Sequence, residues 1–336
     1  MDATTPRTAT AVWKFLFILT LVLIVAGLGC NPFKNLMKNR NVRNLPGVQA
    51  VTGPIPPIYT SSILGVKLPQ AVAVNAEGTL LYIAEGDGDR GVRVLDLRTR
   101  GTVQNLFPPD SIPGKRKPMS IALASSGMLF VVDRVRNAVD MYDPQGQWLG
   151  ILSDPPTAFG RWEPLGVTVS PKGALYVTNA NPEGPPLAEY DIAGRFLTAI
   201  EAGGSVPYTL SFPTSLAVLG DKDYTFVADS NSGRVVVLDQ SAALVATYGR
   251  TSGDEALALP RGISIDNRGF VYVADVTSDN VKVWDASTEP AKFLFTFGQS
   301  GFADGEFLYP NSVAVDGNRR IYVADTGNDR VQIWRY

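Results

Sequence analysis

The last part of the chain, from Tyr309 to Trp334, has the sequence YPNSVAVDGNRRIYVADTGNDRVQIW. It contains three short apolar runs, Ser312–Val315, Ile321–Ala324 and Val331–Trp334, and residues that favour turns separate them. Apolar runs of this length, bounded by Gly, Asn and Asp, predict antiparallel strands rather than helices. The stretch therefore predicts one compact unit, which opens with a proline and whose second strand ends on an acid.

The same unit occurs five more times upstream. Its opening prolines recur at intervals of 46 to 50 residues, at Pro69, Pro118, Pro164, Pro213, Pro260 and Pro310. Its second strand ends on an acid or an amide, at Glu85, Asp133, Asn179, Asp229, Asp275 and Asp325. Four short strands in about 40–50 residues, repeated along a chain, are typical of a β-propeller, in which each unit is one radial blade. We therefore predict an all-β, six-bladed β-propeller with four-stranded antiparallel blades.

The sequence also predicts how the ring closes. The third strand of the last unit ends at Trp334, two residues before Tyr336, so this unit has no fourth strand of its own. Upstream of the first opening proline lies the segment 57–64, PIYTSSIL, in the place where a fourth strand precedes the other prolines. We expect this segment to supply the outer strand of the last blade, which removes an open sheet edge. The propeller would then span residues 58–336.

The unit P-x-[GS]-[VI]-[AS]-[VI]-D-x-x-G-x-[VI]-Y-V-A-D-x-x-N-x-R-V resembles the NHL repeat, most strongly in the last three units. The resemblance implies a six-bladed NHL propeller. Such propellers serve as sensor domains, peptide-processing lyases, RNA-binding platforms and scaffolds, so the resemblance implies a fold and leaves the function open.

Composition excludes several kinds of chemistry. The chain has no histidine and one cysteine. Without histidine there is no imidazole base, no His-ligated zinc and no Ser-His-Asp triad, so the zinc mechanism of the α-amidating lyases among NHL proteins is excluded. A single cysteine excludes a disulfide within the chain and a thiolate metal cluster. With 45% apolar residues and a net charge of −2, the chain has the composition of a globular protein with a large core.

The N-terminal residues 1–30 predict a signal peptide or a membrane anchor. Arg7 and Lys14 precede an apolar run, 15–29, which is short for a membrane span and is followed at once by Cys30. This ending resembles a bacterial lipoprotein signal, in which the cysteine becomes acylated, although Gly27 departs from its usual Leu. An uncleaved anchor and a simple secretory signal are the alternatives. We expect an extracytoplasmic protein attached to the membrane through its N-terminus.

Residues 31–57 predict a linker between this segment and the propeller. They contain several prolines and glycines, and four basic residues but no acid. These cations could lie against anionic lipid headgroups, and after an uncleaved helix they would favour the cytoplasmic side. The topology of an uncleaved chain is therefore left open, whereas export agrees with the short apolar run and with Cys30.

The acid that ends each second strand has two interpretations. Six copies argue for a structural role, in which each side chain accepts backbone N–H groups of the next loop and pairs with Arg90, Arg234 or Arg330. Alternatively, Glu85, Asn179 and Asp229 converge on the channel as oxygen ligands for Ca²⁺, as the calcium-dependent propeller lactonases that they resemble would imply. The second interpretation predicts a hydrolase or lyase.

A basic and aromatic group of side chains predicts a binding surface instead. These residues should lie on the face that carries the longer loops, where Arg and Trp favour binding and cations attract anionic partners. The group comprises Lys115, Arg116, Lys117, Arg134, Arg136, Arg161, Trp162, Arg261, Tyr309 and Asn311. A solvated rim is the simpler alternative. We favour a non-catalytic scaffold that needs no cofactor and binds a protein, peptide or glycan of the cell envelope. We do not expect a nucleic-acid partner for an exported protein.

Overall fold

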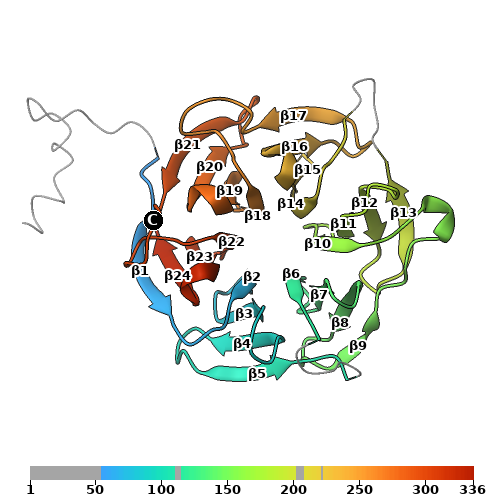
Figure 1. The fold of residues 1–336 in the computed structure, drawn as a ribbon, viewed down its shortest axis with the longest axis horizontal. Coiled ribbons are helices and arrows are strands. Elements are labelled where there is room, and N and C mark those ends of the chain that lie inside the picture. Colours follow the sequence, from blue (N-terminus) through green and yellow to red (C-terminus); the bar gives the residue numbers. More distant parts are fainter. Residues whose placement is uncertain (1–53, 110–114, 202–207, 221) are drawn as a thin grey trace, which may run out of the picture. The chain divides into compact units, whose positions relative to one another are not determined.

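The computed structural model describes residues 54–109, 115–201, 208–220 and 222–336. Within these residues, six four-stranded antiparallel sheets stand around a central channel, so the predicted six-bladed β-propeller is confirmed (Figure 1). No helix of the described part is long and apolar enough to cross a membrane. The predicted signal or anchor, with Cys30 and most of the linker, lies outside the described residues.

In each blade the first strand lines the channel and the fourth lies at the outer rim (Figure 1). Blade one contains β2 (Pro69–Val74), β3 (Leu80–Glu85), β4 (Val92–Asp96) and β5 (Thr102–Leu106). Blade two contains β6 (Pro118–Leu123), β7 (Leu129–Asp133), β8 (Ala138–Tyr142) and β9 (Trp148–Ile151). Blade three contains β10 (Pro164–Val169), β11 (Leu175–Asn179), β12 (Leu187–Tyr190) and β13 (Phe196–Ile200).

The second half of the ring repeats this order. Blade four contains β14 (Pro213–Leu219), β15 (Tyr224–Asp229), β16 (Arg234–Leu238) and β17 (Leu244–Tyr248). Blade five contains β18 (Pro260–Ile265), β19 (Phe270–Asp275), β20 (Asn280–Asp285) and β21 (Lys292–Phe297). Blade six contains β22 (Pro310–Val315), β23 (Arg320–Asp325), β24 (Arg330–Arg335) and, from the start of the ring, β1 (Ile58–Ile63). Four short 3-10 helices are η2 (Thr157–Phe159), η3 (Ser230–Ser232), η4 (Val276–Ser278) and η5 (Thr326–Asn328).

The hydrophobic core lies between the blades. Alternate residues of a strand point to opposite faces of its sheet, and in this ring a neighbouring blade covers each face. In β19, Val271 and Val273 pack with residues of blade four, whereas Tyr272 and Ala274 pack with residues of blade six. This explains why the second strands are continuous apolar runs instead of alternating with polar residues.

The opening proline and the terminal acid of the second strand occupy one end of each blade. Pro310 lies opposite Asp325 in the pairing of β22 with β23, and a bulge follows the proline. Pro69 and Glu85 have the same relation in blade one. A proline is tolerated here because the inner strand is a sheet edge, whose free side faces the channel and needs no backbone donor.

The ring closes as predicted, through β1. This strand pairs antiparallel with β24, from Ile58 opposite Arg335 to Ile63 opposite Val331. Additional hydrogen bonds join blade six to blade one near the channel. The Thr326 hydroxyl donates to the Pro69 carbonyl at 2.6 Å, and a neighbouring serine of β22 accepts from a backbone N–H of β2. The first and last blades are therefore joined at the rim and at the channel.

Candidate binding site at the channel mouth

The two ends of the channel differ in the connections that surround them. The opening prolines and the terminal acids lie at one end, together with the loops between second and third strands and the connections between blades. We call this end the loop face. The short turns after the first strands lie at the opposite end, which we call the turn face. All residues of the predicted binding group belong to loops or strand ends of the loop face.

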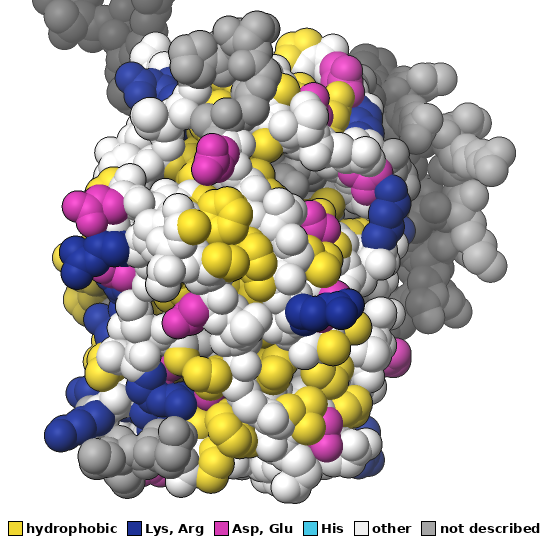
Figure 2. Space-filling model, turned by 90° about the vertical axis from the view of Figure 1, so that its right-hand side faces the viewer, with side chains coloured by type: hydrophobic (Ala, Val, Ile, Leu, Met, Phe, Trp, Pro, Cys, Tyr) yellow, Lys and Arg dark blue, Asp and Glu magenta, His cyan; other side chains and the backbone are white. Residues whose placement is uncertain are grey.

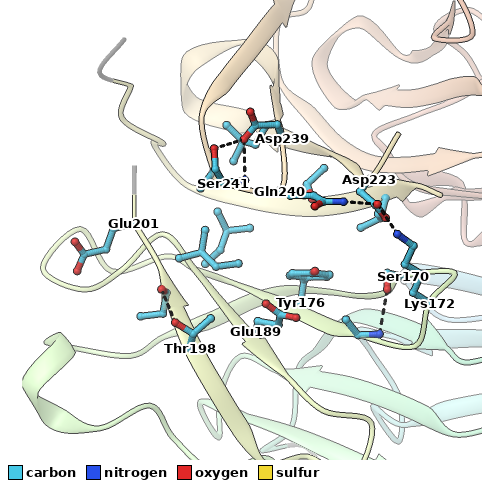
Figure 3. Close-up of a pocket in the computed structure, with 18 residues that line it drawn as sticks. Ser170, Lys172, Tyr176, Glu189, Thr198, Glu201, Asp223, Asp239, Gln240 and Ser241 are labelled. Carbon is cyan, nitrogen blue, oxygen red and sulfur yellow. Dashed lines mark hydrogen bonds and ion pairs between the residues drawn. The ribbon is translucent and has the colours of Figure 1, made fainter. Parts of the chain in front are cut away.

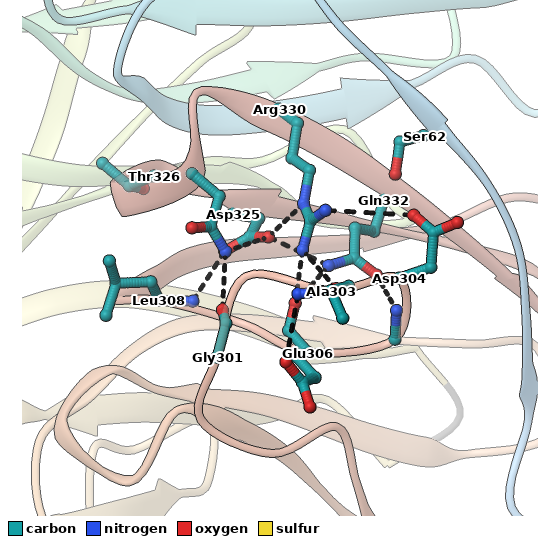
Figure 4. Close-up of polar contacts among 12 residues, drawn as sticks. Ser62, Gly301, Ala303, Asp304, Glu306, Leu308, Asp325, Thr326, Arg330 and Gln332 are labelled. Atoms are coloured by element: carbon teal, nitrogen blue, oxygen red, sulfur yellow. Dashed lines mark hydrogen bonds and ion pairs between the residues drawn. The ribbon is translucent and has the colours of Figure 1, made fainter.

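The acid at the end of each second strand has a structural role, as the repeat pattern predicted. In blade six the Asp325 carboxylate is fully buried and accepts from the Leu308 N–H at 2.7 Å and from Arg330 Nε at 2.6 Å (Figure 4). It also accepts from Gln332 Nε2 at 2.9 Å. Arg330 in turn donates to the carbonyls of Ala303 and Glu306. Asp325 therefore fixes the connection that leads into its own blade.

The three candidate calcium ligands make the same kind of contact. Glu85 accepts the Lys67 N–H at 2.8 Å and forms an ion pair with Arg93. Asn179 accepts a hydrogen bond from a loop N–H at 2.8 Å. Asp229 accepts one from a loop N–H and another from Arg234 Nε. Each side chain thus bonds to its own blade, and the structure does not bring them together. In the part of the chain that the structure describes, no group of three or more His, Cys, Asp or Glu side chains is placed to hold a metal ion.

Three arginines of the predicted binding group are paired with acids of the protein. Arg134 contacts Glu163 of the next blade at 2.7 Å, and Arg136 contacts Asp140 at 2.6 Å. Arg161 is more exposed and lies 3.8 Å from Glu183. Trp162 packs against the core between blades two and three. These side chains stabilise the loop face, and most of their charge is compensated there.

The three consecutive cations before blade two differ in their exposure to solvent. Lys115 and Lys117 are exposed, whereas Arg116 is 5% exposed. The Arg116 guanidinium lies over the Phe107 ring, 4.5 Å from its centroid, and donates to the Asp89 carbonyl at 2.5 Å. It therefore links blade two to blade one and is not available on the surface.

The residues that directly follow the opening prolines form a ring around the channel mouth. A small cavity of about 30 Å³ lies among them. The ring consists of Gln70, Met119, Leu165, Thr214, Arg261 and Asn311. Asn311 Nδ2 donates to Gln70 Oε1 at 3.1 Å across the joint between blades six and one. The sequence prediction included Arg261 and Asn311 but missed Gln70, although its position after a proline was visible in the repeat.

Arg261 is the only cation of this ring, and its charge is not compensated. Its Nε is buried without a hydrogen-bond partner, and none of the described acids forms an ion pair with it. Met119 and Leu165 in the same ring are apolar, and burial lowers the pKa of the Arg261 guanidinium. A partly buried guanidinium whose charge has no partner is unfavourable, so this group favours an anion that approaches through the mouth.

Tyr309 stands at the edge of this mouth. Its side chain is 54% exposed, and its backbone adopts a φ of 53°. The Tyr309 N–H donates to the carboxylate of Asp279 in the preceding blade at 2.7 Å. Leu68 has a φ of 44° and donates in the same way to Asp329. Such left-handed backbone positions in residues other than glycine are sparsely populated and often occur at functional sites.

Below the mouth the channel widens into a cavity of about 300 Å³ lined by the inner strands. The side of the molecule that carries blade three has a different character. Acidic and basic side chains are mixed there with hydrophobic ones and form no patch of one sign (Figure 2). On the loop face, the uncompensated charge of Arg261 lies beside the cavity at the channel mouth.

Comparison with known proteins agrees with this architecture. The NHL repeat matches residues 307–334, and no curated protein matches the chain. A structural genomics protein of unknown function from Bacteroides thetaiotaomicron VPI-5482 is similar in structure, with 15% identity and a TM-score of 0.64 over 84% of this chain and 72% of that chain. Kuenenia stuttgartiensis hydrazine synthase has 13% identity and a TM-score of 0.57, over 86% of this chain and 99% of that chain. A streptogramin B lyase has 13% identity and a TM-score of 0.56, over 83% and 96% of the two chains. At these identities the likeness shows the fold alone.

Proposed function

We propose that this six-bladed β-propeller, whose last blade contains an NHL repeat, is a non-catalytic binding module for an acidic segment of a protein or peptide. NHL propellers commonly mediate protein binding. The uncompensated guanidinium of Arg261 at the channel mouth is the observation that supports an anionic ligand. A carboxylate of the partner would pair with it, while exposed groups of the loop face, such as Tyr309, would contact the surrounding chain.

Replacing Arg261 by Gln is expected to weaken the binding of an acidic probe by at least about tenfold. A hydrogen bond to a charged group contributes roughly 1.5–3 kcal/mol, and about 1.4 kcal/mol is a tenfold change in affinity. The probe is an N-acetylated hexaglutamate peptide, and hexaglutamine is its neutral counterpart. Calorimetric titration of the full chain should detect binding of hexaglutamate alone, and this binding should weaken as salt is added.

Arg195→Gln is the matched control because it removes the same charge from a different place. Arg195 is exposed on the turn face, where it pairs with Asp191. The control is expected to bind hexaglutamate like the natural chain. An equal loss of hexaglutamate affinity in both variants would mean that the effect depends on net charge alone, and it would contradict the proposal. A sulfated oligosaccharide that binds through Arg261 in place of hexaglutamate would identify the partner as a glycan instead.

We further propose that the propeller is held at the outer side of a membrane as a lipoprotein. The short apolar run and the cysteine that follows it support this location. In a bacterial host fed with an alkyne fatty acid, the natural chain is expected to become labelled, and Cys30→Ser is expected to abolish the label. A membrane-bound chain without label would favour the uncleaved anchor, and a label that persists in Cys30→Ser would exclude Cys30 as its site.

A further inference from the structure

A groove separates blades three and four, and it runs from their turns on the turn face to the loop-side ends of β12 and β13. Its volume is about 530 Å³. Tyr176 and Glu189 project into it from blade three, and Asp223, Asp239 and Gln240 face them from blade four (Figure 3). Because neighbouring blades of a propeller normally pack their faces against each other, a groove of this size needs an explanation.

The first part of the explanation is a carboxylate at a core position. In the middle of each third strand, one residue lies opposite an aromatic residue of the second strand and faces the next blade. In the other five blades this residue is apolar, namely Val94, Met141, Val237, Val283 and Ile333. These five side chains belong to the core between their blade and the next one. In blade three the residue is Glu189, which lies opposite Tyr176.

The second part of the explanation is that blade four has smaller side chains where it faces blade three. At four of the other five interfaces, the last residue of the third strand facing the preceding blade is a tyrosine or a tryptophan, namely Tyr142, Tyr190, Trp284 and Trp334. Blade four has Leu238 at this position. The residue of β15 opposite Leu238 is Thr225, where the other blades have a leucine, valine or isoleucine. The groove thus has a carboxylate on its blade-three wall and smaller or more polar residues on its blade-four wall.

Glu189 differs from Asp223 and Asp239, which have partners within the protein, and from Glu201, which is exposed. Asp223 forms an ion pair with Lys172 and accepts from Gln240. Asp239 accepts from Ser241 and from the backbone of its own turn. By contrast, no lysine or arginine within the described ranges pairs with Glu189, which is partly buried. Burial, followed by the nearby Glu189 charge, raises the pKa of Tyr176, so the phenol stays protonated.

This arrangement is unfavourable for stability. A carboxylate replaces an apolar side chain at a packing position and has no cation to compensate its desolvation. Positions that break a local rule of the fold without a structural gain are expected to be functional. A ligand that supplies the missing positive charge and the missing apolar volume would compensate both defects.

We propose that the groove binds a primary alkylammonium group. The ammonium would donate to the Glu189 carboxylate and lie against the Tyr176 ring, and its alkyl stem would pack on Leu187, Ile200 and Leu238. A lysine side chain and a free alkylamine share this chemistry. The site is independent of the proposed function at the loop face.

Three variants of the full chain test this proposal with pentylamine and with a lysine-containing tripeptide as probes. Glu189→Gln keeps the shape and removes the charge, and it is expected to weaken amine binding at least tenfold. Glu189→Val restores the type of residue that the other blades have. It is expected to abolish binding and to raise Tm by about 2–4 °C. Glu77→Gln removes an exposed acid from the turn face of blade one and is expected to bind like the natural chain.

The two probes distinguish the source of the ammonium group. Tighter binding of the tripeptide would indicate a lysine of a polypeptide, and tighter binding of pentylamine would indicate a free amine. No binding of either probe to the natural chain would overturn the proposal, as would equal binding by all three variants. Binding of a neutral sugar such as glucose, unaffected by Glu189→Gln, would assign the groove to a different ligand class.

Discussion

Asp325→Ala is expected to lower the free energy of unfolding by about 3–5 kcal/mol. The carboxylate is fully buried and accepts from a backbone N–H, from Arg330 and from Gln332. Arg330 and Gln332 are themselves buried, so removing Asp325 leaves a buried guanidinium without its carboxylate partner and a buried amide with one acceptor fewer. Urea denaturation measured by circular dichroism gives the change directly.

Two further variants make this result specific. Asp254→Ala removes an exposed acid from a loop and is expected to change the stability by less than about 0.5 kcal/mol. Asp325→Asn keeps an oxygen acceptor and should cost less than Asp325→Ala, because Asn179 fulfils the same role in blade three. If Asp325→Ala were no more destabilising than Asp254→Ala, the structural role of the repeated acid would be wrong.

Removal of the strand that closes the ring is expected to have an effect of similar or larger size. A chain that starts at residue 65 lacks β1, so β24 becomes a bare sheet edge. It also loses the buried Ile63 and the contact of the Tyr59 ring with Trp334, whose ring centroids lie 6.0 Å apart. Loss of a buried aliphatic side chain costs about 2–5 kcal/mol, and several ladder hydrogen bonds contribute about 0.5–1.5 kcal/mol each. A decrease of more than about 5 kcal/mol in the free energy of unfolding would be enough to unfold many domains.

The measurement compares this chain with one that starts at residue 54 and retains β1. The longer chain should unfold cooperatively and elute as a compact species, whereas the shorter chain should be unfolded or aggregated. Equal melting of the two chains would contradict the closure of the ring through β1.

The fold was predictable because the same sequence pattern occurs six times in the chain. The spacing of the prolines and the acid that ends each second strand, as in Pro310 and Asp325, determine the number of blades and the position of the loop face. The closing strand was predictable because no fourth strand follows β24 in the sequence and the segment before Pro69 occupies the place of a fourth strand in the repeat. These are local sequence patterns, which can be recognised without knowing any distance between residues in the structure.

The candidate site was less predictable because it depends on contacts between blades. Arg134 and Glu163 are 29 positions apart and belong to different blades, so their ion pair could not be inferred from the sequence. Arg261 differs from the paired arginines Arg134, Arg136 and Arg161 in that no acid contacts it, a difference that the sequence does not show. Glu189, in contrast, could have been found by aligning the third strands, where it is the only acid among Val, Met and Ile residues.

Photo-crosslinking in cells, with the full-length chain, tests the proposed function most directly. A photoreactive residue at position 309 stands beside the channel mouth, and one at position 245, on the outer strand β17, is a control with comparable exposure. We expect position 309 to capture one or two proteins through acidic segments identified by mass spectrometry, and Arg261→Gln to abolish this capture. Capture that is equal from both positions, or that persists in Arg261→Gln, would contradict a binding site for acidic segments at the channel mouth.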